Sequence, residues 1–439
     1  DAGVCPASLA DRIAVTSIDL SVDIRYKRAS YDYFPVDERI SLGVRADGSG
    51  HVAWIDDASG NIRVTPLTSS LSRSGDDVVV PGTDIGGFVE REDGFALLTR
   101  RADPGDPETD PNASGAPALA ALLVRYRGDS ELFAAPLTGT TAITHARDPA
   151  ARDCTPPFLY GRLAWNGVKY GAYFQVHGCS GDPHASYYGD KLVYADDLGR
   201  AISGGWDWNC SENQGLRLLA EPDIFTSICL SDQSPNPGLN LVVEGVPTQQ
   251  LGAEWSMPGY VAAQLGSLVK LGDGGYMIAW LSRGVDASHP AAAKMADDIA
   301  AVRLGSDYGV IAPKTWWVET PSIAETNLHV VRYGSDRLLV IWETITNPRC
   351  SATTCFGDYG GTFARLIDEH GHWLTAQTAI AAVPNTGEDL IILPNGDVAW
   401  AFVPDDARNY EAPITRDRND VPVVPSKHSL SIARMRVCE

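Results

Sequence analysis

The stretch that decides the fold is Asp273-Gly274-Gly275-Tyr276-Met277-Ile278-Ala279-Trp280, a tight turn followed at once by an apolar run that ends in tryptophan. Close copies are Asp47-Gly48-Ser49-Gly50-His51-Val52-Ala53-Trp54 and the shorter Asn395-Gly396-Asp397-Val398-Ala399-Trp400. Asp-Gly and Asn-Gly favour tight turns, and a short apolar run behind such a turn is typical of a buried strand. A turn-plus-strand unit therefore recurs along the chain.

Weaker copies of this unit begin at Asp93, Tyr170 and Asp336, and the late copies start about 60 residues apart. A partner strand follows each copy, and two partners match closely, residues 61–68 and 131–138. Alternation of apolar and polar residues with a period of two runs through most of the partners. Each repeat is therefore at least a hairpin.

Repeats of about 40 to 60 residues that cannot bury a face alone are typical of radial stacking, and ring closure removes exposed sheet edges. We predict an all-β chain that forms a single β-propeller over residues 1–439, with about seven four-stranded blades within a range of six to eight; a β-sandwich array is the alternative. The run Ile13–Leu20 should pair with the C-terminal strand and close the ring. We also expect a loop-rich insertion at about 165–240 and a mobile loop at about 103–117.

Charge narrows the class of partner. The chain carries 35 basic and 56 acidic side chains, a formal net charge of -21. This field repels phosphate backbones and anionic headgroups and attracts cations, so calcium or a transition metal is a plausible cofactor while nucleic acid is disfavoured. No run reaches the roughly 18 to 20 apolar residues of a membrane helix, so we expect a soluble monomer without membrane insertion.

Eight cysteines at irregular spacing, with no Cys-x-x-Cys pair, favour disulfides over zinc or redox motifs. Disulfides form in oxidising compartments, so the protein is predicted to be secreted, periplasmic or displayed at the cell surface. One pair is close enough to staple a loop, one joins the two ends of the chain, and four fall in one stretch whose connectivity spacing leaves open. The predicted pairs are Cys350–Cys355, Cys5–Cys438, Cys154–Cys229 and Cys179–Cys210.

The recurring turns resemble those of extracellular β-propeller proteins in general, a resemblance of architecture only, because the Asp-box pattern of sialidases is missing. Residues 170–230 also resemble a motif of uncharacterised exported bacterial proteins, carried by Gly189-Asp190-Lys191-Leu192 and the run Gly205-Trp206-Asp207-Trp208-Asn209-Cys210-Ser211. That resemblance implies export and no activity. Gly-x-Ser-x-Gly, His-Glu-x-x-His, phosphate-loop and dinucleotide-binding patterns are also missing, which argues against those enzyme classes.

The densest polar and aromatic stretch runs from residue 170 to residue 217. Its two tryptophans, two positions apart, should lie on one face of a strand, where they either stack on a sugar ring or pack in the core. Its two histidines either ligate copper or zinc or are solvated in a packed loop. The predicted ligand-binding residues are Tyr187, Tyr188, Trp206, Trp208, Glu212 and Arg217, and the predicted metal ligands are His177 and His184.

Two other polar patterns have simpler interpretations. His370 and His372 fall at a predicted hairpin tip and are interpreted as solvated turn residues. Four acidic pairs lack the alternating pattern of a calcium loop and are interpreted as Asx turns. These pairs are Asp56-Asp57, Asp196-Asp197, Asp297-Asp298 and Asp405-Asp406.

Together these features predict an exported binding protein that recognises a glycan or an extracellular protein through loops on one face. The alternative is an enzyme, metal-dependent or polysaccharide-degrading, with a site built from residues 170–217. A lyase acting on uronic-acid polymers is disfavoured, because the basic residues of this stretch are scattered within an acidic chain: Lys169, Lys191, Arg200 and Arg217. A rigid scaffold is a third hypothesis, and the fold alone does not choose among them.

Overall fold

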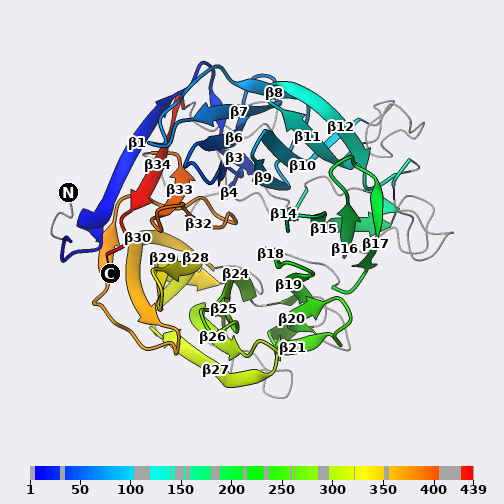
Figure 1. Cartoon of the computed structure of the whole chain (residues 1–439). Coiled ribbons are helices and arrows are strands. Elements are labelled where there is room, and N and C mark those ends of the chain that lie inside the picture. The colour runs from blue at the N-terminus through cyan, green and yellow to red at the C-terminus, as the bar shows by residue number, and fades with distance from the viewer. Residues whose placement is uncertain are drawn as a thin grey trace, which may run out of the picture. The chain divides into compact units, whose positions relative to one another are not determined.

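The computed structural model describes residues 5–29, 35–102, 119–139, 141–143, 153–154, 159–178, 188–210, 215–231, 237–257, 260–261, 263–284, 296–320, 322–350, 355–404 and 427–438. Within these residues the chain is an all-β propeller of seven four-stranded antiparallel blades (Figure 1), as predicted. The described helical structure is one 3₁₀ turn, Ala10–Arg12. None of the described helical segments is long and apolar enough to cross a membrane.

The blades follow one another along the chain, each as an antiparallel meander. Blade 1 contains β5 (Ser41–Val44), β6 (Gly50–Asp56), β7 (Ile62–Leu67) and β8 (Val78–Val80), with β2 (Ile24–Arg25) also paired to β6. Blade 2 contains β9 (Gly87–Arg91), β10 (Gly94–Ala102), β11 (Leu119–Arg127) and β12 (Ser130–Pro136). Blade 3 contains β14 (Gly161–Trp165), β15 (Tyr170–Gly178), β16 (Tyr188–Ala195) and β17 (Ala201–Asp207), with β13 (Asp153–Cys154) also paired to β15.

Blade 4 contains β18 (Leu216–Ala220), β19 (Phe225–Ser231), β20 (Gly238–Val243) and β21 (Gln249–Gly252). Blade 5 contains β24 (Ala263–Lys270), β25 (Tyr276–Ser282), β26 (Asp298–Leu304) and β27 (Val310–Val318). Blade 6 contains β28 (Ile323–Tyr333), β29 (Arg337–Cys350), β30 (Cys355–Asp368) and β31 (Thr378–Ile380). Blade 7 contains β32 (Ile391–Ile392), β33 (Val398–Phe402), β34 (Ser429–Met435) and β1 (Ile13–Asp19); two short pairs, β3 (Lys27–Ala29) with β4 (Pro35–Asp37) and β22 (Trp255–Met257) with β23 (Tyr260–Val261), lie outside the blades.

The recurring signature forms the second strand of blades 1, 5 and 7. All residues of β6, β25 and β33 are buried, so these strands need apolar side chains on both faces. The three tryptophans that end the signature are buried with their indole N–H groups bonded, Trp54 to Thr65 Oγ1 at 2.9 Å, Trp280 to Glu254 Oε1 at 2.9 Å and Trp400 to the Ala382 carbonyl at 3.2 Å. The turn glycines Gly48, Gly274 and Gly396 have φ near +85°, a conformation that favours glycine.

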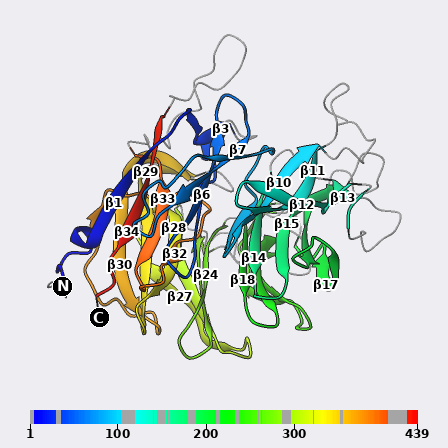
Figure 2. The same ribbon diagram turned by 45° about the horizontal axis from the view of Figure 1, so that its top comes forward.

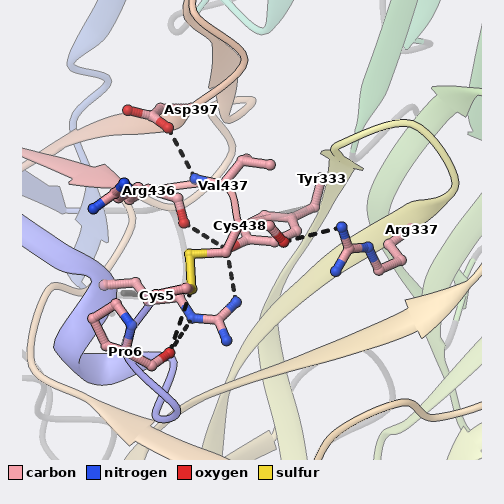
Figure 3. The surroundings of a disulfide bond; sticks show 9 residues. Cys5, Pro6, Tyr333, Arg337, Asp397, Arg436, Val437 and Cys438 are labelled. Atoms are coloured by element: carbon pink, nitrogen blue, oxygen red, sulfur yellow. Dashed lines mark hydrogen bonds between the residues drawn. A yellow bond between two sulfur atoms is a disulfide. The ribbon is translucent and has the colours of Figure 1, made fainter. Parts of the chain in front are cut away.

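The N-terminal strand completes blade 7, as predicted. β1 pairs antiparallel with β34 from Ile13↔Met435 to Asp19↔Ser429, and in Figure 2 β1, β34 and β33 run side by side. The disulfide Cys5–Cys438 joins the segments that flank these two strands (Figure 3). Around it, the Arg12 guanidinium donates to the Tyr333 hydroxyl, 3.1 Å, which donates in turn to the Arg436 carbonyl, 2.5 Å.

The chain divides into two compact units. Unit 1 comprises residues 1–59, 65–76 and 254–439, and unit 2 comprises residues 60–64 and 77–253. In each unit the core lies between the faces of consecutive blades, with one apolar cluster between blades 5 and 6 and another between blades 2 and 3, for example. The span 165–240, expected to be a loop-rich insertion, contains strands β15 to β20 in its described part, and the loop 103–117 lies outside the described residues.

Candidate functional site

The two tryptophans of the predicted binding stretch pack on different core clusters. Trp206, on β17, meets the Tyr173 ring edge-on with centroids 5.5 Å apart. Trp208 follows the end of β17 with a φ of +56° and packs over Gly189, in the cluster between blades 2 and 3. The expectation that both rings share one strand face is wrong, because the left-handed backbone at Trp208 breaks the alternation of the strand.

Asp190 on β16 is the polar centre of this stretch. It is fully buried and accepts hydrogen bonds from the Tyr173 hydroxyl at 2.5 Å, the Trp206 indole N–H at 3.3 Å and the Cys210 amide at 2.8 Å. Burial raises the pKa of Asp190 to about 6, although the hydrogen bonds act in the opposite direction. The carboxylate thus ties the end of β17 to the body of blade 3.

The other described candidates of this stretch also make internal contacts. His177 and Tyr188 are half-buried cross-strand partners with ring centroids 5.9 Å apart, and His177 Nδ1 lies 2.7 Å from the Gly178 carbonyl. Arg217 on β18 is buried and donates to the Leu216 carbonyl at 2.9 Å. Tyr187, His184 and Glu212 lie outside the described residues, so the histidine metal pair stays a prediction.

Three disulfides join described cysteines. Cys5–Cys438 and Cys350–Cys355 confirm the prediction. The third bond joins Cys210 to Cys229, so the predicted pairs Cys154–Cys229 and Cys179–Cys210 are both wrong. The reason is local, because the bonds of Asp190 hold Cys210 beside β19, which carries Cys229.

Asp190, Cys210 and Cys229 place one ligand-type atom each within 4.8 Å of one another. Metals bind cysteine as the thiolate, whereas these two sulfurs are bonded to each other. Both oxygens of Asp190 already accept hydrogen bonds. In its oxidised form this cluster is therefore a structural staple.

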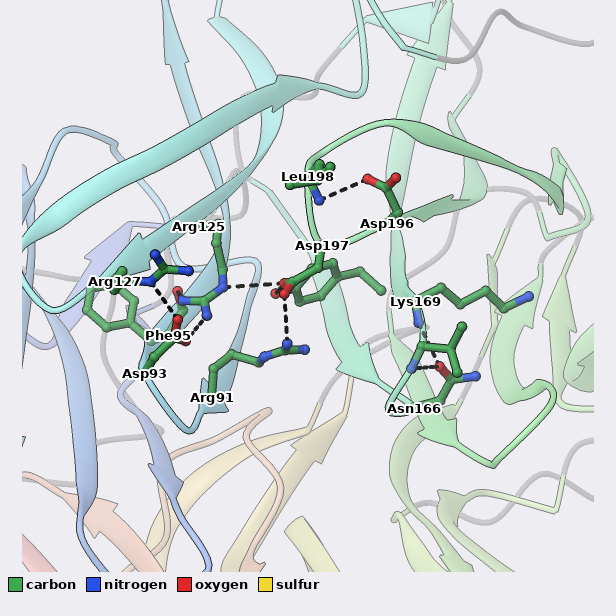
Figure 4. A network of polar contacts seen from close by, with 12 residues as sticks. Arg91, Asp93, Phe95, Arg125, Arg127, Asn166, Lys169, Asp196, Asp197 and Leu198 are labelled. Atoms are coloured by element: carbon green, nitrogen blue, oxygen red, sulfur yellow. Dashed lines mark hydrogen bonds and ion pairs between the residues drawn. The ribbon is translucent and has the colours of Figure 1, made fainter.

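A second polar cluster of unit 2 joins turns of blades 2 and 3 (Figure 4). Arg125 is almost fully buried between Asp93 and Asp197, and Arg127 also donates to Asp93, at 2.7 Å. Burial raises the pKa of Asp93, but the hydrogen bonds from Arg127 and Arg125 outweigh it and the net pKa is lowered. Arg91 pairs with Asp197 at 3.1 Å. Each carboxylate is neutralised by guanidinium groups, so the cluster is a structural network.

The interpretation of the two histidines is confirmed, and that of the acidic pairs is partly wrong. The backbone amides of His370 and His372 donate hydrogen bonds to the Asp368 carboxylate in an exposed turn, as expected for a hairpin tip. Among the acidic pairs, Asp56 and Asp196 accept amides of their own turns. For Asp297-Asp298 the Asx-turn interpretation is wrong, because both side chains are buried where β26 begins. Asp405 and Asp406 lie outside the described residues.

Glu254, Ser282 and Lys314 meet in a buried contact of unit 1 that has the residue types of a serine–lysine hydrolase. The Ser282 hydroxyl lies 2.8 Å from Lys314 Nζ and 2.6 Å from Glu254 Oε2. Lys314 also forms an ion pair with Glu254. These contacts anchor β27 to the end of β25.

Unit 1 also contains a strained polar site that the sequence analysis missed. The pairing of β28 with β29 shifts register between Thr326 and His329, and Asn327 at this bulge has a φ of +48°. Its amide donates to Glu343 and, at 2.9 Å, to the Pro384 carbonyl, while its oxygen lies 2.9 Å from His329 Nε2. Positive φ at a residue other than glycine needs support from its surroundings and clusters at functional sites.

The segment after Pro384 lines a small cavity. Asn385 is held rigidly there, since its oxygen accepts the Ile40 amide at 3.3 Å and its amide donates to the Glu38 carbonyl at 2.9 Å. Glu388 pairs with Arg39 at 2.7 Å. The lining comprises Ile40, Leu42, Pro384, Asn385, Glu388, Asp389, Leu390, Trp400 and Ala401.

The lining combines carboxylates and an amide with aliphatic and indole groups. Such a surface accepts hydrogen bonds from hydroxyl or ammonium groups while covering an apolar ring face. The sequence held one signal of this site. Blade 7 begins with Pro384-Asn385-Thr386-Gly387-Glu388-Asp389, and its first strand β32 has only two residues, Ile391–Ile392, within the described part of the chain.

No family model matches this chain, and no curated protein matches it. Solved structures are similar in fold, among them a Dyadobacter fermentans protein of unknown function (12% identity, 81% of this chain and 99% of that chain covered, TM-score 0.39). Others are Kuenenia stuttgartiensis hydrazine synthase (10%, 84% and 92%, 0.46) and Trypanosoma rangeli sialidase with 2,3-difluorosialic acid (10%, 76% and 57%, 0.41). At these identities and scores no residue role is transferred to this chain.

Proposed function

We propose that this protein is an exported binding protein for a glycan, and that the small cavity beside Asn385 receives a polar group of one sugar residue. The observation that supports this most is the cavity lining, in which Glu388, Asp389 and Asn385 lie together with aliphatic and indole groups. The cavity is small, so it receives a polar group of a sugar rather than a whole ring. Export is supported by the disulfides.

The negative charge of the protein favours some classes of sugar over others. The whole chain has a net charge of -21, so a uronate or another acidic sugar is repelled. Neutral and amino sugars offer hydroxyl and ammonium donors to the carboxylates. The ligand class that we propose is therefore a neutral or amino-sugar glycan, and an extracellular protein is the alternative.

The test is a glycan array followed by calorimetry with the best binder. The array compares the wild type with Glu388→Gln/Asp389→Asn, which keeps the shape of the lining and removes its charge. Asp336→Asn is the matched control, because Asp336 is 78% exposed on blade 6. Trp208→Phe tests the aromatic stretch of blade 3 as a competing site.

We expect neutral or amino sugars to bind the wild type and the control, with a loss of about tenfold or more in the double variant, the effect of one or two hydrogen bonds to charged groups. Binding that survives in the double variant and falls in Trp208→Phe would move the site to blade 3. An array without any binder contradicts the glycan proposal and favours a protein partner. The enzyme alternative gains no support from the described part of residues 170–217, where each polar candidate serves an internal contact.

A further inference from the structure

Three carboxyl groups are buried together where blades 5 and 6 meet. Asp298 is the first residue of β26, Asp297 precedes it, and Glu325 lies on β28. Their exposed fractions are 3%, 2% and 1%. The side chains of Asp298 and Glu325 are hydrogen-bonded to each other. Because two carboxylates have only acceptors, this bond requires that one of them carries a proton.

The charges around the pair favour that proton. Asp297 stands beside it, and the guanidinium of Arg283 is engaged by Asp297 at 2.8 Å. Glu325 Oε2 and Asp297 Oδ2 are buried without a hydrogen-bond partner among the described residues. The pKa of Glu325 is raised to about 9, and burial is the main cause. The charge and hydrogen bond of Asp298 and the charge of Asp297 act in the same direction. Glu254 adds negative charge near Asp297, whose pKa is also raised, chiefly by burial.

The pair sits among the contacts that join the two blades. The Thr320 amide, in the connection between the blades, donates to Asp298 Oδ1 at 3.0 Å, and the Glu325 amide donates to the Asp297 carbonyl at 2.8 Å. Arg283 also lies 3.4 Å from the sulfur of Cys355, in the disulfide that closes the β29–β30 hairpin. A small apolar cluster, Ala296, Ala324, Ile345 and Cys355, packs at the same junction.

We propose that Asp298 and Glu325 form a proton-operated clasp, in which one shared proton holds the start of β26 against β28 and its loss loosens the junction and the stapled hairpin. The direction in which stability changes with pH follows from the linkage between proton binding and folding. The folded state holds the proton more tightly than the unfolded chain, so the stability that it contributes is complete in acid and falls as pH rises from about 4.5 towards 9. Most native carboxylates have the opposite effect, because they are ionised and paired.

The first experiment is urea unfolding between about pH 5 and pH 8. It compares the wild type with Glu325→Gln, which keeps a donor toward Asp298 at every pH. Glu319→Gln is the matched control, since Glu319 is exposed in the connection to the same blade. We expect the unfolding equilibrium constant of the wild type to rise relative to Glu325→Gln by up to about tenfold per pH unit, and the control to follow the wild type. Parallel profiles of wild type and Glu325→Gln would overturn the proposal.

The control also separates the clasp from the general charge of the chain, because acid lowers the net negative charge in all three proteins equally. Hydrogen exchange, corrected for the intrinsic effect of pH, locates the change. Faster exchange at pH 8 than at pH 5 in residues 298–304 and 323–350 of the wild type, absent in Glu325→Gln, supports the clasp. Loosening spread evenly over all blades contradicts it.

If Glu325→Gln does not fold, the wild type still tests the proposal through infrared spectroscopy. A protonated buried carboxyl gives a carbonyl band distinct from that of carboxylates. The band should be present at pH 7.5 and disappear above about pH 9, and Asp298→Asn should shift its position by changing its hydrogen-bond partner. A spectrum without such a band at pH 7.5 overturns the proposal.

Discussion

Replacing Asp190 by asparagine tests the polar centre of blade 3 with the smallest change of shape. The wild-type carboxylate accepts from three donors, the Tyr173 hydroxyl, the Trp206 indole and the Cys210 amide. Asparagine has one acceptor oxygen, which Cys210 can retain. The new amide then faces the other two groups, and the Tyr173 hydroxyl can rotate to accept from it, whereas an indole N–H can only donate.

The expected loss of unfolding free energy follows from the number of donors that are left without an acceptor. One buried donor, the Trp206 N–H, is left without an acceptor, which costs about 1 to 3 kcal/mol of unfolding free energy. A second effect depends on pH. Since burial raises the pKa of Asp190 from 3.8 to about 6, the folded wild type holds the proton more tightly and loses stability as pH rises through this range. The gap between wild type and Asp190→Asn should thus narrow by about 2 kcal/mol between pH 4.5 and pH 7.

Urea unfolding followed by tryptophan fluorescence and by circular dichroism measures both effects. Asp223→Asn is the control, because Asp223 is exposed in a turn of neighbouring blade 4. An Asp190→Asn protein as stable as the wild type at every pH, or a gap that widens as pH rises, would refute the reasoning.

Three more predictions test other described features. Replacing Cys5 and Cys438 together by serine should lower the unfolding free energy by about 2 to 5 kcal/mol, and an unchanged urea midpoint would contradict this. Asn327→Ala should cost about 2 to 4 kcal/mol in thermal unfolding and Asn327→Gly less, because glycine relieves the positive φ; equal losses would argue against backbone strain. Replacing Cys210 and Cys229 by serine should leave the zinc content of the oxidised protein unchanged by plasma mass spectrometry, and zinc that is lost in this variant would show that the staple is a metal site.

The repeat predicted the fold because each level of the sequence favoured the same structure. Turn glycines stand at the positions of positive φ, and the apolar runs behind them are buried on both faces. The unpaired run at the N-terminus was placed correctly against β34, because a propeller needs a last strand wherever one blade lacks it. The turn residues, the apolar runs and the need for a complete last blade were therefore enough to predict these features.

The site was less predictable, because long-range contacts decide it. Trp206 and Trp208 look like one stacking pair until a single left-handed residue separates them. Asp297 and Asp298 have the composition of a turn, yet both are buried, Asp297 paired with Arg283 and Asp298 bonded to the amide of Thr320. The bulge at Asn327 and the cavity beside Asn385 depend on the register of β28 and on blade 7, which local spacing does not encode.

The bond between Cys5 and Cys438 makes the backbone between these residues a closed covalent loop. A protease that cuts this loop once opens it without dividing it, so the product remains one molecule of unchanged mass apart from one water. Two cuts are needed before any fragment can leave. In this chain a first cleavage in a surface connection would therefore leave all seven blades in one covalently joined molecule.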